Sequence, residues 1–167
     1  MLIRPERPDD VDAIDRLTVA AFEPQWFSDG SEAPIIRRLR ASGDLTISLV
    51  AEDDADVVGH AAFSPVTIDG SHNGWFGLGP ISVRLDRQRQ GIGRALVAEG
   101  LRRLRERGAR GCALIGNPEI YSRMGFTSDQ TMSHLDLDPA VVQHISLTGR
   151  PPRGELRFAP AFGAAGH

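Results

Sequence analysis

Residues 87–95 read RQRQGIGRA, from Arg87 to Ala95, and this stretch decides how the rest of the chain is interpreted. Gly91 and Gly93 allow a tight turn and let backbone amide groups approach a ligand closely. The stretch stands directly before a helical pattern, and a helix N-terminus adds unpaired N–H donors and the positive end of the helix dipole. It therefore predicts a phosphate-binding loop, which the flanking arginines reinforce.

The segments on either side of this loop have clear patterns of their own. Downstream, apolar residues at helical spacing predict a helix over Ile92–Arg107, and Gly108 is a candidate C-cap. Upstream, Trp75–Val83 is predicted to be a strand that its glycines and proline loosen. The inner face of the helix is formed by Ile92, Leu96, Val97, Leu101 and Leu104.

Two common nucleotide-binding motifs do not fit the loop. The Walker motif requires a lysine after its last glycine, and all of the basic residues of this chain are arginines. The dinucleotide motif requires a third glycine, and Leu96 stands at that position. On its own, the loop also fits a glycine-rich turn with solvated arginines.

Further outward, the N-terminal part of the chain predicts helices followed by strands. Pro8-Asp9-Asp10 starts a helix that Pro24 ends, and Pro65 predicts a bend or an edge in a long strand. Turn residues between the strands favour antiparallel hairpins. The predicted elements are strand Leu2–Arg4, helices up to Phe22 and over Ala33–Arg40, and strands Ile47–Glu52 and Val57–Ile68.

After the long helix, the predicted elements are shorter. They are strand Cys112–Ile115, a short helix from Pro118 to Arg123, strands Leu135–Leu137 and Leu156–Phe158, and a frayed end over Gly163–His167. The order of helices and strands lacks a regular strand–helix alternation and predicts an α+β fold with a mixed sheet. The length of 167 residues predicts one domain over residues 1–167.

Charge is distributed unevenly along the chain. The net charge is −3, but Arg84–Arg110 has nine arginines against three acidic residues, so it carries +6 and the remainder carries −9. A basic island in an acidic protein favours a small polyanionic ligand and disfavours nucleic acid as a partner. No apolar run approaches the roughly 20 residues that cross a bilayer, and charged residues near the start leave no N-terminal signal pattern. We therefore expect a cytoplasmic protein without a membrane partner.

The loop in its context resembles a known family. Gln88-x-x-Gly91-x-Gly93 followed by Ala95-Leu96 is similar to the pyrophosphate-binding motif of the GNAT acetyltransferase superfamily. In that family the loop follows the fourth strand and starts the third helix, and a bulge splays the fourth strand from the fifth. Gly79-Pro80 tolerates such a bulge. The family often has alanine at the position of Gly93, and both residues are common there.

Three other segments extend the resemblance over nearly the whole chain. Asn117–Phe126 contains a tyrosine and an apolar-Gly-Phe turn that resemble the second GNAT signature. Gly59–Val66 and Pro160–Phe162 look like the corresponding segments of a small bacterial branch of uncharacterised acetyltransferases. The first seventy residues match mainly in the order of their elements.

The resemblance implies a GNAT-like α+β fold, with a mixed central sheet, splayed fourth and fifth strands and flanking helices. It also implies acetyl-CoA as co-substrate. Backbone N–H groups near Ile81–Val83 would bind the pantetheine arm and polarise the thioester, and Asn117 would lie near the thiol end. Tyr121, the single tyrosine, would be the general acid that protonates the leaving thiolate; its alternative role is packing. The implied cofactor-binding residues are Ile81, Ser82, Val83, Gln88, Arg89, Gln90, Gly91, Ile92, Gly93, Arg94, Ala95 and Asn117.

The general base is open at this point. His60 on a predicted strand and Glu32 at the start of the second helix are candidates, as is a water chain, whereas Glu119 fits a helix cap better. The histidines show no metal-ligand spacing, so no metal is expected. Cys112 fits a buried apolar residue. Trp26, Phe27 and Trp75 are core residues or line an acceptor cleft.

We therefore expect an N-acetyltransferase that moves an acetyl group directly to a primary amine of a small molecule or peptide. A catalytically inactive CoA-binding sensor or partner-binding module is an alternative. A nucleotide-dependent phosphotransferase is a further one, which the missing lysine and the order of elements disfavour. Exposed edges of splayed strands favour a homodimer, and the acidic remainder of the chain favours a cationic acceptor.

Overall fold

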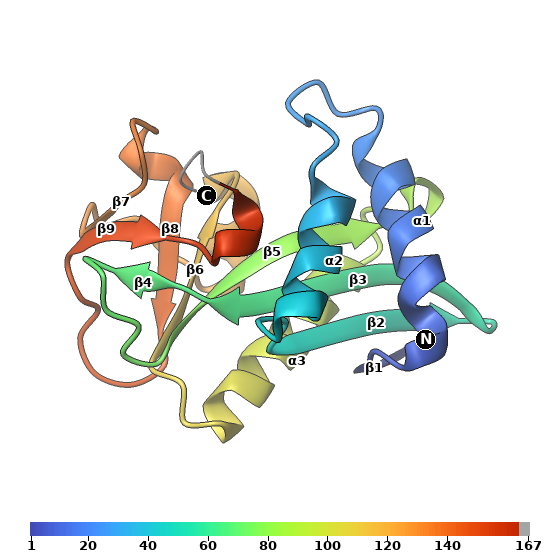
Figure 1. Ribbon diagram of the computed structural model, residues 1–167, viewed down its shortest axis with the longest axis horizontal. Coiled ribbons are helices and arrows are strands. Elements are labelled where there is room, and N and C mark those ends of the chain that lie inside the picture. The colour runs from blue at the N-terminus through green and yellow to red at the C-terminus, as the bar shows by residue number, and fades with distance from the viewer. Residues whose placement is uncertain (164–167) are drawn as a thin grey trace. The chain divides into compact units, whose positions relative to one another are not determined.

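A computed structural model describes residues 1–163 of the chain, and the predicted frayed end beyond Gly163 lies outside them. Short 3₁₀ turns connect several of the helices and strands (Figure 1). The elements are β1 (Leu2–Pro5), α1 (Val11–Phe22), α2 (Glu32–Ser42), β2 (Ile47–Asp53), β3 (Asp56–Pro65), β4 (Thr67–Ile68), β5 (Trp75–Val83), α3 (Ile92–Glu106), β6 (Gly111–Ile115), α4 (Pro118–Tyr121), β7 (Met132–Ser133), β8 (Val142–Ser146) and β9 (Gly154–Arg157).

The chain divides into two compact units. The first consists of Met1–Phe63 and Gly79–Gly100, and the second of Ser64–Leu78 and the chain from Leu101 onward. Strands are hydrogen-bonded in the order β1-β2-β3-β5-β6-β8, and β4-β9-β7 form a smaller sheet. Parallel and antiparallel pairs both occur, which confirms the predicted α+β class with a mixed sheet.

In the first unit, two helices cover one face of antiparallel strands. β2 pairs with β1 on one side and with β3 on the other. Figure 1 shows α1 and α2 lying across these strands, and Ile14, Ile36 and Val50 form a buried cluster there. Burial of one apolar face of each helix is the main reason that such short helices are stable. Buried Arg4 ties the start of the chain to this layer, because it pairs with Asp10 at 2.7 Å.

The opposite face of the same strands receives the first half of α3. Alternate residues of β3 point to this face, and two glycines allow the close approach. A Cβ atom on Gly59 would lie 2.9 Å from Ile92 Cγ2, and one on Gly100 would overlap the ring of Phe63. The helix is therefore held against β3 at the point where the glycine loop leads into it.

Replacement of Gly100 by alanine tests this packing. Phe63 is completely buried, so its ring has little room to move, and we expect Gly100→Ala to destabilise the protein by about 1–3 kcal/mol despite the better helix propensity of alanine. Gly93→Ala in the same helix is the matched control. Its Cβ would make an ordinary 3.8 Å contact with Val83, so we expect a gain of about 0.5–1 kcal/mol. Urea unfolding of both variants measures the difference, and equal stabilities would contradict the packing argument.

The second unit is built on β6. The first residues of β5 pair with it in parallel, from Trp75–Gly111 to Gly77–Ala113, and β8 pairs with it antiparallel. Its core consists of small and apolar residues that surround a nearly fully buried Trp75, whose ring leaves no room for a side chain on Gly111. The core cluster is Val66, Ile68, Trp75, Ala113, Met132, Val142 and Leu156.

Strand β5 is irregular at the predicted position. Val66 N–H donates to Trp75 O, and Arg84 N–H donates to Val58 O, so β5 advances one residue more than β3 between these two bonds. One extra residue on one strand is a β-bulge. Gly79 has a φ of +140°, and the Gly79–Pro80 peptide bond is cis. The expected bulge at Gly79-Pro80 agrees with this register.

Two predicted strands need correction. The run Val57–Ile68 is not one strand, because β3 ends at Pro65 and β4 pairs instead with β9. The prediction of a strand over Leu135–Leu137 is wrong: Leu135 has a φ of +52° and Leu137 N–H closes a turn on His134 O. The sequence analysis also missed β8, which pairs along its whole length with β6.

Candidate functional site

The glycine loop contains two left-handed residues within a tight turn. Arg89 has a φ of +63° and Gly91 of +85°, whereas Gln88 before them is extended, with a φ of −72° and a ψ of 157°. Successive N–H groups in such a turn face one side and form an anion-binding concavity. Arg89 lacks the conformational freedom of glycine, so its left-handed conformation is held at an energetic cost. The loop therefore has the backbone geometry of a phosphate site.

The N-terminus of α3 directly follows this loop. Ala95 N–H donates to Gly91 O at 3.0 Å, which is the first helical hydrogen bond, so the N–H groups of Ile92–Arg94 lie in the turn that has no partner within the helix. Buried Ile92 anchors this turn against β3, and Gly93 lies beside Val83 at the end of β5. The first unit thus brings together the predicted cofactor-binding residues of strand Ile81–Val83 and of the loop and helix over 88–95.

Several polar side chains near the loop hold its shape. The Arg84 guanidinium pairs with Asp86, and Arg87 reaches Asp53 at 2.8 Å. Gln88 Nε2 donates to Val83 O at 3.1 Å and ties the loop back to β5. The Arg87 guanidinium also lowers the pKa of the Asp53 carboxyl. These contacts neutralise part of the basic island that the sequence indicated.

Arg89 is different from these arginines. Its side chain is exposed and has no hydrogen-bond or ion-pair partner among residues 1–163. It stands in the turn that precedes Gln90 and Gly91. A guanidinium without a carboxylate partner at an anion-binding turn is available for a phosphate. Arg89 is therefore the side chain of the loop best suited to contact a polyanionic ligand directly.

The second unit contains the other two predicted site residues. Asn117 is the N-cap of α4: its Oδ1 accepts a hydrogen bond from Glu119 N–H at 3.0 Å. The local role of this side chain is therefore to start the helix that bears Tyr121, with Pro118 at the first helical position. The sequence analysis assigned Asn117 to the cofactor and did not foresee the cap.

Two neighbours pack closely against the ring of Tyr121. Its Cε2 lies 2.6 Å from where a Cβ atom on Gly116 would be, and Phe126 contacts it edge to face at a centroid distance of 6.1 Å. Burial raises the pKa of the Tyr121 hydroxyl, so it is protonated at neutral pH and can donate a proton or a hydrogen bond. This is the protonation state that a general acid requires.

A partly buried polar chain in the first unit was missed by sequence reasoning. Arg40 donates to both carboxylate oxygens of Glu6 at 2.8 and 2.9 Å, and Ser48 Oγ donates to Glu6 Oε1 at 2.7 Å. His60 Nε2 lies 2.8 Å from the same Ser48 Oγ. Burial by itself raises the pKa of Glu6, but the hydrogen bonds from Arg40 and Ser48 outweigh it, so the net pKa is lowered and Glu6 is ionised. No local pattern links these residues, because they come from α2, β2, β3 and the loop after β1.

His60 at the end of this chain predicts a pH-dependent stability. Burial lowers its pKa to about 4 in the folded protein, against 6.5 for an unperturbed histidine, and Glu6 only partly opposes this. The unfolded chain therefore binds a proton at a higher pH than the folded one. Stability is fully present above pH 6.5 and falls by about 3 kcal/mol as the pH drops from 6.5 to about 4.

Unfolding of His60→Gln as a function of pH checks this expectation. The variant removes the titrating group, so its stability curve should be flatter between pH 6.5 and 4 than that of the wild type. His144→Gln is the matched control, because burial also lowers the pKa of His144 but that variant keeps His60. Parallel curves for His60→Gln and wild type would contradict the buried neutral state of His60.

The other residues considered as catalytic or metal-binding candidates have structural contacts that account for them. Glu32 Oε1 accepts a hydrogen bond from Ser28 at 2.7 Å, and Glu119 is exposed in the first turn of α4. Burial raises the pKa of the Cys112 thiol far above its usual range, so this cysteine is not a nucleophile. Within residues 1–163 no three acidic, histidine or cysteine side chains gather as a metal site would require. None of the described helices is long and apolar enough to cross a membrane.

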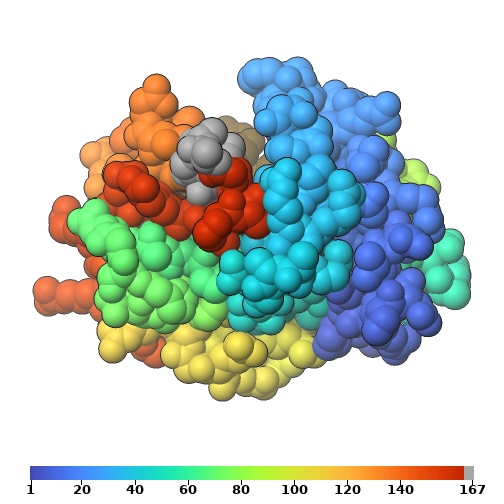
Figure 2. Space-filling view, viewed as in Figure 1, coloured from blue at the N-terminus to red at the C-terminus, as the bar shows by residue number. Residues whose placement is uncertain are grey.

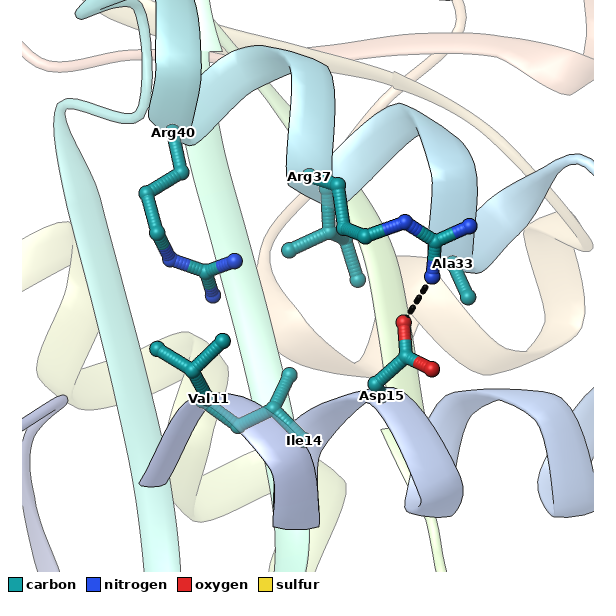
Figure 3. A pocket seen from close by; sticks show the side chains of 7 residues that line it. Val11, Ile14, Asp15, Ala33, Arg37 and Arg40 are labelled. Atoms are coloured by element: carbon teal, nitrogen blue, oxygen red, sulfur yellow. Dashed lines mark hydrogen bonds and ion pairs between the residues drawn. The ribbon is translucent and has the colours of Figure 1, made fainter. Parts of the chain in front are cut away.

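The aromatic residues fall into two groups. Trp75 is a core residue, but Trp26 is 93% exposed and Phe27 60% exposed in the segment between α1 and α2. That segment stands out at the upper edge of the first unit in Figure 2. Nearby, a shallow depression between α1 and α2 is spanned by the ion pair of Asp15 and Arg37 (Figure 3). Most of the lining residues are apolar, and the charged ones are already in ion pairs, Asp15 with Arg37 and Arg40 with Glu6. The depression therefore offers no free polar group to a ligand.

Comparison with known proteins identifies the family of this arrangement. The model of the acetyltransferase (GNAT) domain matches residues 44–128, which include the glycine loop and α4. The N-acetyltransferase YhbS of Escherichia coli K12, which is itself called uncharacterized, is 43% identical over 138 residues, covering 82% of this chain and 78% of YhbS.

Two solved structures have nearly the same fold. A GNAT family acetyltransferase from Brucella melitensis in complex with acetyl-CoA is 44% identical, with a TM-score of 0.87 and 97% of each chain covered. YhbS from Escherichia coli in complex with CoA is 33% identical, with a TM-score of 0.88, over 96% of this chain and 91% of YhbS. The chain belongs to the GNAT family of N-acetyltransferases.

Proposed function

We propose that this protein transfers an acetyl group from acetyl-CoA directly to a primary amine of a small molecule or peptide. The observation that carries the proposal is the loop of Gln88–Gly91, whose turn with left-handed Arg89 and Gly91 leads into the N-terminus of α3. Two relatives of the same fold, at 44% and 33% identity, have acetyl-CoA or CoA bound. These observations support acetyl-CoA as co-substrate.

The loop residues have distinct tasks in this proposal. The N–H groups from Arg89 to Arg94 bind the pyrophosphate, whereas the predicted donor Ala95 N–H is already used in the helix, and the unpaired guanidinium of Arg89 adds a charge contact. Strand Ile81–Val83 lies beside Gly93 and provides N–H groups for the pantetheine arm and the thioester carbonyl. Gln88 keeps its hydrogen bond to Val83 O and so holds loop and strand together.

The chemical step needs a proton donor and a proton acceptor. The neutral amine attacks the thioester carbonyl carbon, a C–N bond forms, and the carbonyl electron pair moves to oxygen. As the carbonyl re-forms, the C–S bond breaks and the thiolate takes the proton of the Tyr121 hydroxyl. The amine nitrogen loses one proton to a base or to water. Tyr121 then recovers a proton from solvent, and the products are CoA and an N-acetyl amide.

A cationic amine is the acceptor that the charges favour. Outside the basic segment Arg84–Arg110 the chain carries a net −9, which attracts ammonium groups. Exposed Trp26 and Phe27 are in edge-to-face contact at 5.9 Å and provide aromatic surface, which favours cations. We therefore place polyamines, amino sugars and peptides with free amino groups first in a screen.

Calorimetric titration with acetyl-CoA, with ATP as control, tests the proposed co-substrate. We expect micromolar binding of acetyl-CoA and none of ATP, because the loop lacks the lysine of nucleotide-binding loops. Mass spectrometry of the amine screen then tests transfer. Binding without any acetylated product would favour a CoA-binding module without catalysis, and absence of binding by the folded protein would refute the proposal.

A further inference from the structure

The polar chain that ends at His60 has only one consistent arrangement of protons. The ionised Glu6 carboxylate can only accept, so the single hydroxyl hydrogen of Ser48 goes to Glu6. Ser48 Oγ must then accept from His60, which makes His60 Nε2 the protonated nitrogen. His60 is neutral in its buried site, so its Nδ1 has a free lone pair.

Ser82 lies directly across from His60 in the neighbouring strand. The bond from Arg84 N–H to Val58 O sets the antiparallel register at this end of β3 and β5. Counting two residues back from Arg84 and two forward from Val58 pairs Ser82 with His60. Opposite residues share one face of a sheet, with Cβ atoms roughly 4.5–5.5 Å apart. Both side chains belong to the first compact unit.

These two side chains are buried and unsatisfied. His60 is 0% and Ser82 3% exposed, and neither His60 Nδ1 nor Ser82 Oγ makes a hydrogen bond with any residue from 1 to 163. One atom is a pure acceptor and the other carries a hydrogen that rotates freely about its C–O bond. Buried polar groups in native proteins are almost always paired, so two complementary unpaired atoms on opposite residues require an explanation.

We propose that His60 is a positioning residue that orients the hydroxyl of Ser82 toward a bound substrate. A change in the Ser82 side-chain torsion lets its O–H donate to His60 Nδ1. The oxygen of Ser82 then presents only lone pairs, so it accepts a hydrogen bond from an N–H group. The hydrogen bonds from Ser82 through His60 and Ser48 to Glu6 then all point in one direction, which strengthens Ser82 Oγ as an acceptor, and Arg40 donates to Glu6 from the other side.

The N–H group comes from one of two parts of the reaction, and this inference rests on the proposed function. Ser82 stands between Ile81 and Val83, the strand residues expected along the pantetheine arm, whose amides carry N–H donors. The acceptor amine is the other N–H donor in an acetyl transfer. Both sources have the same chemistry, a hydrogen-bond donor that a hydroxyl oxygen recognises.

Nuclear magnetic resonance tests the positioning contact without any substrate. In protein labelled with ¹⁵N-histidine, the signals of His60 are those that disappear in His60→Gln. We expect the Nε2–H tautomer, and we expect Ser82→Ala to move the Nδ1 signal to higher chemical shift, as for a nitrogen that loses a donor. Ser82→Thr, which keeps the hydroxyl, should leave the signal nearly in place. A protonated Nδ1, or equal Nδ1 shifts in wild type and Ser82→Ala, would overturn the proposal.

Binding and turnover then identify the source of the N–H group. Loss of one hydrogen bond weakens binding by about fivefold. If the donor is the pantetheine amide, Ser82→Ala weakens acetyl-CoA binding by that factor in calorimetry. If the donor is the amine, Ser82→Ala keeps its affinity for acetyl-CoA, and the KM for the best amine of the screen rises about fivefold. In both cases Ser82→Thr should stay close to the wild type.

A double variant separates positioning from general damage. His60→Phe keeps a ring in the sheet but has no acceptor nitrogen, and it should cost no further affinity when combined with Ser82→Ala. Additive losses, or wild-type binding and turnover in Ser82→Ala, would refute the role of His60. If the wild type binds no acetyl-CoA, the proposed function fails, and the magnetic resonance experiment alone decides whether His60 orients Ser82.

Discussion

Gly93→Leu is expected to weaken acetyl-CoA binding by more than about hundredfold while the protein stays folded. Gly93 lies in the first turn of α3, whose N–H groups we propose to bind the pyrophosphate, and a Cβ atom on it would lie 3.8 Å from Val83 Cγ2. A methyl group fits that space, whereas a leucine side chain must extend into the volume that a pyrophosphate would occupy. The loss therefore arises from exclusion of the ligand and not from unfolding.

Two comparison variants make this expectation specific. Gly93→Ala should bind acetyl-CoA nearly as the wild type does, because its Cβ makes an ordinary contact only. Gly91→Val tests the left-handed position of the loop, and Gly108→Val is its matched control, since Gly108 has a similar φ of +76° and open space at the other end of α3. Calorimetry and thermal unfolding of the four variants give the result. Wild-type affinity in Gly93→Leu would remove the pyrophosphate from this loop.

The loop and its helix could be predicted from sequence because their signals are local. Two glycines and a helical apolar pattern stand within twenty residues of each other, and the structure begins α3 at Ile92 as expected. The shift in register along β5 was expected at Gly79-Pro80 for the same reason. Proline restricts the backbone and glycine frees it, and neither effect depends on the tertiary surroundings.

The polar chain behind Ser82 could not be predicted in this way. Ser48 is 42 residues from Glu6 and 12 from His60, and only the pairing of β2 with β1 on one side and with β3 on the other brings them together. His60 could be proposed as a possible base from the sequence, but its hydrogen-bond partner Ser48 is brought to it only by the tertiary structure. Burial also makes His60 a weak proton acceptor, because charging it in that site is unfavourable. A role as hydrogen-bond acceptor fits its surroundings better than a role as base.

The errors at the C-terminal end have the same origin. Leu135-Asp136-Leu137 alternates like a strand, but Leu135 takes a left-handed conformation and the segment turns on itself. Conversely, β8 is a strand because β6 provides hydrogen bonds along its whole length. Strand propensity is strongly dependent on such partners, so short strands without a clear pattern are found only when the sheet is known.

Tyr121→Phe is expected to lower kcat by about 10²- to 10⁴-fold, the usual contribution of a general acid. The ring of phenylalanine keeps the contacts with Gly116 and Phe126, so stability and acetyl-CoA affinity should change little. Burial raises the pKa of the Tyr121 hydroxyl, so the wild-type acid stays protonated throughout the neutral range. Single-turnover measurements are the appropriate readout, since product release, and not the chemical step, limits the turnover of many enzymes.

The acidity of the leaving thiol distinguishes an acid from a residue that only packs. A thiolate that is a weak base needs little protonation, so an acetyl thioester of a more acidic thiol should restore much of the rate of Tyr121→Phe. Loss of a purely structural contact would slow both donors equally. The hydroxyl is the only chemical difference between the two side chains, and the ring packs closely against Gly116 in either case. A rate unchanged by Tyr121→Phe, or a deficit that is the same for both thioesters, would therefore assign the leaving-group proton to another donor.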